Sequence, residues 1–176
     1  ENSIGEYIKL GPIFADLIRE FVVEKEQLKS KLNLPINKKI IAFLDHTVGY
    51  SGVLTVDAYN KFLETIITLS KANPEFYFLF KSKKSLAQIS LSAGKKSIEL
   101  IEEIKFNKNT VYVNDYSINQ FQLMAISNLV ISAPMSSVFY ESLAGGIRTI
   151  SYDPCGQYKN YNVPSVQFEK MYASTY

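Results

Sequence analysis

Five short apolar runs, separated by segments long enough to hold a helix, constrain the fold of this chain more than any other feature of its sequence. They are KIIAFLD (39–45), FYFLFK (76–81), TVYVND (110–115), NLVIS (128–132) and RTISYD (148–153). The runs are rich in Ile, Val, Phe and Tyr without strict alternation, which is typical of strands covered on both faces. They therefore predict a parallel sheet.

The segments between the runs carry the periodicity of amphipathic helices. Five apolar residues between the first two runs share the i, i+3, i+4, i+7, i+8 spacing of one helix face and predict a helix over 56–72. They are Tyr59, Phe62, Leu63, Ile66 and Ile67. Residues 95–104 are also expected to be helical, and the polar stretch 82–94 is expected to be a loop or a loosely defined helix.

Two further helices are marked by their ends. Ser117 and Gln120 have the spacing of a capping box and stand before FQLMAIS, which predicts a helix start there. A last helix is expected to begin after Pro134 and to end at Gly145 and Gly146, because glycine readily takes the left-handed conformation that closes many helices. Alternating strands and helices predict right-handed crossovers, and so an α/β fold: a Rossmann-like parallel sheet with helices on both faces.

The chain divides into three stretches. Residues 39–154 hold all five runs and are predicted to form the Rossmann-like nucleotide-binding domain. Residues 1–38, which include a charged, helix-prone segment at 21–32 and no initiator Met, are expected to be a linker and leading helix from a missing N-terminal domain. Residues 155–176 are expected to be a C-terminal tail, irregular or with a short docking helix near 165–172.

Charge and composition narrow the classes of partner. Nineteen Lys and Arg against 17 Asp and Glu give a net charge of +2, and no long basic run is present, which argues against nucleic acid. One cysteine and one histidine cannot build a usual zinc site, so no metal is expected, and a cytoplasmic location fits. The apolar runs are much shorter than the about 20 residues that cross a bilayer, so no transmembrane segment is expected.

Polar residues follow each predicted strand, at the edge where open parallel sheets bind ligands. After the fourth run, Ser136 and Ser137 precede a helix whose free N–H groups would attract an anion. Glu141 lies about one turn into that helix, where its carboxylate could bind ribose hydroxyls. The alternative is that a serine only caps the helix and that Glu141 is solvated on its surface.

The loop after the first run, 45–52, holds the only histidine of the chain. His46 could act as a general base or contact a phosphate, and it could equally only hydrogen-bond within the loop. Gly49 would let the backbone approach a phosphate closely, although the spacing fits neither the dinucleotide motif nor the P-loop. Asp45 is a candidate to orient His46, but adjacent residues at a strand end point in opposite directions.

The segment 128–154, NLVISAPMSSVFYESLAGGIRTISYDP, resembles the nucleotide-binding stretch of GT-B glycosyltransferases. The resemblance implies that the chain is a GT-B C-terminal half in which Ser136 and Ser137 meet the nucleotide phosphates and Glu141 binds ribose. The Ser-Ser pair and the closing Tyr-Asp-Pro most resemble bacterial capsule and surface-polysaccharide biosynthesis proteins. Where many members carry Pro, this chain has Arg148.

The same resemblance suggests two further contacts. Lys81 keeps the cation of a lysine-proline-histidine-proline segment found in sialyltransferase-like relatives, whose histidine is absent here. Asp115 stands where GT-B proteins recognise the base, although Asp also makes turns in any protein. Lys83 and Lys84 are expected to lie in a solvated turn.

The leading hypothesis is a donor-binding domain of a glycosyltransferase in surface polysaccharide biosynthesis, inactive without its acceptor domain. Its expected partners are a nucleotide-sugar and a glycan or lipid-linked acceptor held by a missing N-terminal domain, with no cofactor and with peripheral attachment to the inner membrane face as an option. A UDP-sugar 2-epimerase-like half-enzyme and a non-catalytic α/β interaction module stay open as alternatives. A receiver domain would need paired acidic residues after the first run, and a serine hydrolase would need a GxSxG elbow, which is absent.

Overall fold

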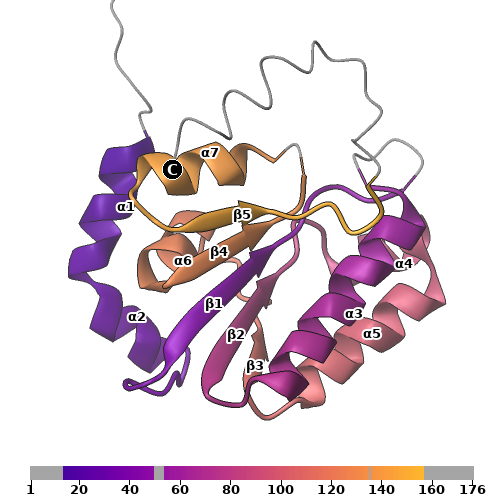
Figure 1. Ribbon diagram of the computed structural model, residues 1–176, viewed down its shortest axis with the longest axis horizontal. Coiled ribbons are helices and arrows are strands. Elements are labelled where there is room, and N and C mark those ends of the chain that lie inside the picture. Colours follow the sequence, from indigo (N-terminus) through magenta and orange to yellow (C-terminus); the bar gives the residue numbers. More distant parts are fainter. Residues whose placement is uncertain (1–13, 50–53, 135, 157–176) are drawn as a thin grey trace, which may run out of the picture.

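The computed structural model describes residues 14–49, 54–134 and 136–156, and in this part of the chain five strands form one parallel sheet (Figure 1). They are β1 (Lys39–Leu44), β2 (Phe76–Lys81), β3 (Thr110–Tyr112), β4 (Leu129–Ser132) and β5 (Thr149–Ser151). All neighbours pair in parallel, in the order β3-β2-β1-β4-β5. The five predicted strands and the α/β class are confirmed.

The strand order places a switch point next to β1. The chain builds β2 and β3 on one side of β1, then crosses to build β4 and β5 on its other side. In register, Leu44 of β1 pairs with Lys81 of β2 and with Ser132 of β4, so these three strands end level with one another. Ligands of open α/β sheets bind at such a point, outside the carboxyl ends of the strands.

One face of the sheet is covered by α3 (Val56–Ala72), α4 (Leu86–Ala93) and α5 (Lys95–Phe106), as Figure 1 shows. The helix predicted over 56–72 is confirmed, and the Thr55 side chain caps it by accepting the Ala58 N–H. Its apolar stripe packs with Phe43 and Phe78 of the sheet in the first core cluster. The stretch 82–94 holds the ordered helix α4, which has a capping box made by Ser85 and Gln88.

The other face is covered by α1 (Phe14–Val23), α2 (Lys25–Lys31), α6 (Gln120–Ile126) and α7 (Ser137–Ala144). Ile18, Leu28 and Leu34 are buried in this second core cluster, so residues 14–34 are a packed layer of the α/β unit. The single helix expected at 21–32 is instead two helices that meet at Glu24. A Cβ on Gly145 would come within 2.8 Å of Ile18 Cδ1, which explains why α1 can cross the end of α7 there.

The start of α6 differs from the sequence prediction. Its cap is Asn119, whose side chain accepts the Gln122 N–H while Gln122 binds back to the Asn119 N–H. Ser117, the predicted cap, instead donates its N–H to Asp115 Oδ1 in a preceding turn. At α7 the prediction holds, and Gly146 takes the left-handed conformation with φ 79°.

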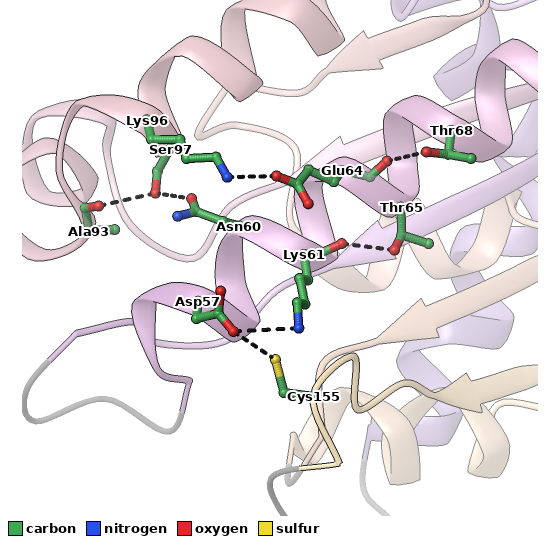
Figure 2. A network of polar contacts seen from close by, with 10 residues as sticks. All are labelled: Asp57, Asn60, Lys61, Glu64, Thr65, Thr68, Ala93, Lys96, Ser97 and Cys155. Atoms are coloured by element: carbon green, nitrogen blue, oxygen red, sulfur yellow. Dashed lines mark hydrogen bonds and ion pairs between the residues drawn. The ribbon is translucent and has the colours of Figure 1, made fainter.

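A polar network joins α3 to α5 and to the last described residues (Figure 2). The buried Ser97 hydroxyl donates to Asn60 Oδ1 at 2.6 Å, and Lys96 pairs with Glu64 at 2.8 Å. Cys155 lies near Asp57 at the start of α3, with its Sγ 3.4 Å from the carboxylate. The predicted docking helix at 165–172 lies outside the described residues. No helix in the described ranges is long and apolar enough to cross a bilayer.

Candidate functional site

A pocket of about 330 Å³ opens at the carboxyl edge of the sheet, beside the switch point between β1 and β4. It is bounded by the ends of β1 and β2, the loop after β3, and the first residues of α6 and α7. Its lining residues are Leu44, Asp45, Lys81, Ser82, Lys83, Tyr116, Ile118, Asn119, Gln120, Phe121, Ser136, Ser137 and Val138. Segments far apart in the sequence therefore form one site.

The amino end of α7 forms one wall of this pocket. Ser136 is buried, and its Oγ accepts the Val138 N–H at 3.3 Å, so its side chain caps the helix. Ser137 is the first helical residue, and its side chain is exposed. Because the first N–H groups of a helix have no partner within the helix, this wall favours an anion. Ser136 thus caps α7 and, with Ser137, lines the pocket, while the phosphate-binding role of the two serines stays a prediction.

Two lysines, at the end of β2 and in the loop that follows it, also line the pocket. Lys81, at the end of β2, is half-buried, donates from Nζ to the Asp115 main-chain oxygen at 3.3 Å, and lies 5.9 Å from the Tyr116 ring centroid. Burial lowers the pKa of Lys81, and this effect outweighs the negative charges of Asp115 and Asp45, which raise it. Lys83 is exposed yet lines the pocket, whereas the sequence placed it in a solvated turn.

Lys84 turns away from these two cations. It does not line the pocket, and its Nζ donates to the main-chain oxygen of Val48 at 3.4 Å. Its side chain therefore joins the loop after β2 to the loop after β1.

Asp45 is the pocket residue that sequence reasoning undervalued. It follows β1 directly and is 6% exposed, with Oδ1 accepting the Lys83 N–H at 2.6 Å and Oδ2 accepting the Tyr59 hydroxyl at 3.0 Å. Burial raises the pKa of Asp45 to about 7, because desolvation of the carboxylate outweighs both hydrogen bonds and the nearby lysine charges. The only signal in the sequence was its place after a strand.

Glu141 and Asp115 lie beside the pocket and do not line it. Glu141 Oε2 accepts the side-chain N–H of Gln120 at 3.0 Å, and Gln120 does line the pocket. Asp115 is exposed, accepts the Ser117 N–H at 2.7 Å, and lies 3.6 Å from Lys31 Nζ. The hydrogen bonds from Ser117 are the main cause of its lowered pKa.

The structure does not bring His46 or Gly49 to this pocket. His46 is half-buried, its Nδ1 accepts the Thr47 N–H at 2.7 Å, and burial lowers its pKa. Gly49 has φ 105°, and a Cβ there would come within 2.8 Å of the Ser92 main-chain oxygen. The glycine therefore permits a close approach between the loop after β1 and the end of α4. The phosphate and catalytic roles of these two residues stay predictions.

Comparison with protein families identifies the family of this chain. Residues 3–173 match the model of the polysaccharide biosynthesis PFTS motif proteins. The chain belongs to this family. No curated protein matches the sequence significantly.

Comparison with solved structures shows that this chain has a GT-B-like fold. The wall teichoic acid polymerase TagF matches with TM-scores of 0.51 and 0.52 at 16% and 15% identity, over 90% and 85% of this chain. Each match covers 33% of the TagF chain, so this chain spans about a third of that protein. A beta Kdo 2,4 transferase, KpsC of Thermosulfurimonas dismutans, has a TM-score of 0.45 at 12% identity over 85% of this chain and 47% of its own. The TagF likeness shows a shared fold and confirms the expected Rossmann-like, GT-B-type architecture.

Proposed function

We propose that this domain binds the nucleotide part of a nucleotide-sugar donor for a glycosyltransferase of polysaccharide biosynthesis. The observation that carries the proposal is the pocket at the switch point, which Lys81 and Lys83 line together with the first residues of α7. Two cations and free helix N–H groups are the groups that hold a diphosphate. The same groups would stabilise the charge that develops on a leaving nucleotide.

A tetrapeptide that resembles the motif in the family name lies at the start of α7. The tetrapeptide PMSS at 134–137 has the Pro and final Ser of PFTS, and it keeps a large apolar residue and a hydroxyl residue between them. We take PMSS as the form of the motif in this chain. Its last two residues, Ser136 and Ser137, are the capping residue and the first residue of α7 in the pocket wall.

Glu141 is proposed to bind the ribose of the nucleotide. It lies one turn beyond the start of α7, and Gln120 holds its Oε2 at the edge of the pocket. A carboxylate fixed in this way can accept hydrogen bonds from the two ribose hydroxyls. Sugar transfer itself, the acceptor and the membrane-side location are proposals for the whole protein. A TagF structure soaked with CDPG makes a cytidine nucleotide a reasonable member of the test panel.

Calorimetric titration with UDP, CMP, CDP and GDP tests the proposal. One nucleotide should bind, and Lys81→Gln and Glu141→Gln should each weaken its binding by roughly ten- to a hundredfold, since hydrogen bonds to charged groups contribute about 1.5–3 kcal/mol. Lys108→Gln and Glu75→Gln change the same charges at exposed sites outside the pocket and serve as matched controls. Equal losses in the controls, or no binding of any nucleotide, would contradict the proposal.

A further inference from the structure

Asp45 anchors the loop that carries the two pocket lysines. Its Oδ1 accepts the Lys83 N–H at 2.6 Å, and its Oδ2 accepts the Tyr59 hydroxyl of α3 at 3.0 Å. Oδ1 thus ties the loop after β2 to the end of β1, and Oδ2 ties Asp45 itself to α3. The carboxyl is buried, yet it lines the pocket beside Lys81 and Lys83.

The loop has further side-chain contacts, one of which reaches the loop after β1: Lys84 Nζ donates to the Val48 main-chain oxygen at 3.4 Å. The Ser82 hydroxyl lies 2.7 Å from the Tyr112 hydroxyl of β3 and donates to the Lys84 main-chain oxygen at 2.8 Å. Neither contact of Ser82 lies between the loop and β1, where Asp45 supplies the acceptor for Lys83. The position of the Lys83 backbone therefore depends on Asp45 directly.

The positive charges around Asp45 do not offset the cost of burying its carboxylate. Lys81 on β2 and Lys83 on the loop favour its ionised form, while Tyr59 on α3 contributes a neutral hydroxyl. Tyr112 on β3 is also neutral, and its raised pKa is due mainly to burial. Burial of Asp45 outweighs these effects and holds the pKa of its carboxyl at about 7.

We propose that Asp45 is the positioning residue of the Lys81–Lys84 loop, and that its carboxyl takes up a proton from solvent when an anion enters the pocket. The proposal rests on the proposed function in taking the ligand to be anionic. A second negative charge in one desolvated site disfavours the first, so a bound anion favours the protonated carboxyl. A protonated Asp45 still offers its carbonyl oxygen to the Lys83 N–H and can donate its proton to the Tyr59 oxygen.

The ligand-free part of the proposal is tested by ¹⁵N NMR of the backbone amides between pH 5 and 9. The Lys83 amide should titrate with a midpoint near 7 in the wild type and should lose that transition in Asp45→Asn, which keeps an acceptor for it. His46→Gln should keep the transition, and the Lys108 amide serves as an internal control. A Lys83 amide that does not titrate, or that titrates equally in Asp45→Asn, overturns the positioning role.

Sulfate tests the proton uptake, because it does not titrate in this pH range. At constant ionic strength, wild-type protein should bind sulfate at least about threefold more tightly at pH 6 than at pH 8, as followed from the Ser137 and Lys83 amides. Asp45→Asn should bind it equally at both, and His46→Gln should behave as the wild type. Equal wild-type affinities, or no sulfate binding, overturn the inference. Proton-linked sulfate binding without any nucleotide binding would instead remove the proposed function alone.

Discussion

Asp45 is a carboxyl group whose surroundings make its charge costly for the folded state. In the unfolded chain its pKa is 3.8, and in the folded protein it is about 7. Between these values the folded state binds more protons than the unfolded state, so the free energy of unfolding falls as pH rises from about 4 to about 7. Above pH 7 the penalty is fully present, and it amounts to at most about 4 kcal/mol.

Asp45→Asn should therefore relieve this penalty at high pH. The amide oxygen can accept the Lys83 N–H, and the amide N–H can donate to Tyr59, so both contacts survive. Relative to the wild type, the variant should gain stability between pH 5 and pH 8, because only the wild type then carries a buried charge. Urea denaturation at the two pH values measures the change, and an unchanged difference would refute this account of Asp45.

Comparing alanine substitutions at Gly49 and Gly94 separates the effect of backbone strain from that of steric overlap. Both have positive φ, at 105° and 81°, but a Cβ would come within 2.8 Å of a main-chain atom only at Gly49, while nothing lies within 4 Å at Gly94. Gly49→Ala should thus be more destabilising than Gly94→Ala, by about 1–3 kcal/mol, because overpacking adds to the strain. Thermal and urea unfolding of both variants test this, with equal losses as the contrary result.

The sequence identified some pocket residues and missed others for a physical reason. Lys81 ends a strand and Ser136 and Ser137 come shortly after one, so the rule for parallel sheets was enough to place them at the pocket. The importance of Asp45 comes from acceptor contacts with Tyr59 and with Lys83, 38 positions along the chain. Tyr59 had only the periodicity of a core residue, and no local pattern reveals such a pairing.

At the scale of elements, α3 is joined to α5 by a buried polar pair and by two exposed ion pairs, Lys71–Glu103 and Lys96–Glu64, of which Figure 2 shows the second. Ser97 is fully buried and donates to Asn60 Oδ1 at 2.6 Å. Lys96 and Glu64 lie 2.8 Å apart, but both side chains are largely in solvent. Buried hydrogen bonds are costly to leave half-made, whereas exposed ion pairs contribute little.

Double-mutant cycles on the buried pair and on the Lys96–Glu64 pair should give different couplings. For Asn60→Ala and Ser97→Ala we expect a coupling of about 1–2 kcal/mol, since Ser97→Ala leaves a buried amide oxygen without this donor. For Lys96→Ala and Glu64→Ala we expect less than about 0.5 kcal/mol. Urea denaturation of the single and double variants measures both cycles, and the reverse order would be incompatible with the burial of the first pair.

The prediction of elements succeeded where the apolar periodicity was long, as in α3. It failed at the start of α6, because Ser117 with Gln120 and Asn119 with Gln122 have the same capping spacing. The structure selects Asn119 because Ser117 is used in the turn with Asp115, while Ile118 between them is buried. A local motif cannot choose between two such registers without that burial.

At the scale of the whole molecule, the fold class could be predicted because every strand run lacked a polar face and every spacer could hold a helix. The role of residues 14–34 could not, since a charged helix-prone segment is compatible with a linker or with a packed layer. Ile18 and Leu28 are buried in one core cluster with residues of α6, α7 and the sheet, so residues 14–34 pack as a layer of the domain. The preceding N-terminal domain stays a prediction, and so does the C-terminal tail with its docking helix near 165–172.

The most direct test of the central claim is to map the bound nucleotide on the domain by NMR. With the nucleotide that binds most tightly, we expect the largest amide shifts at Lys83, Gln120, Ser137 and Val138, which surround the switch point between β1 and β4. Shifts confined to another surface, such as α2 or the neighbourhood of Cys155, would contradict a donor site at this pocket.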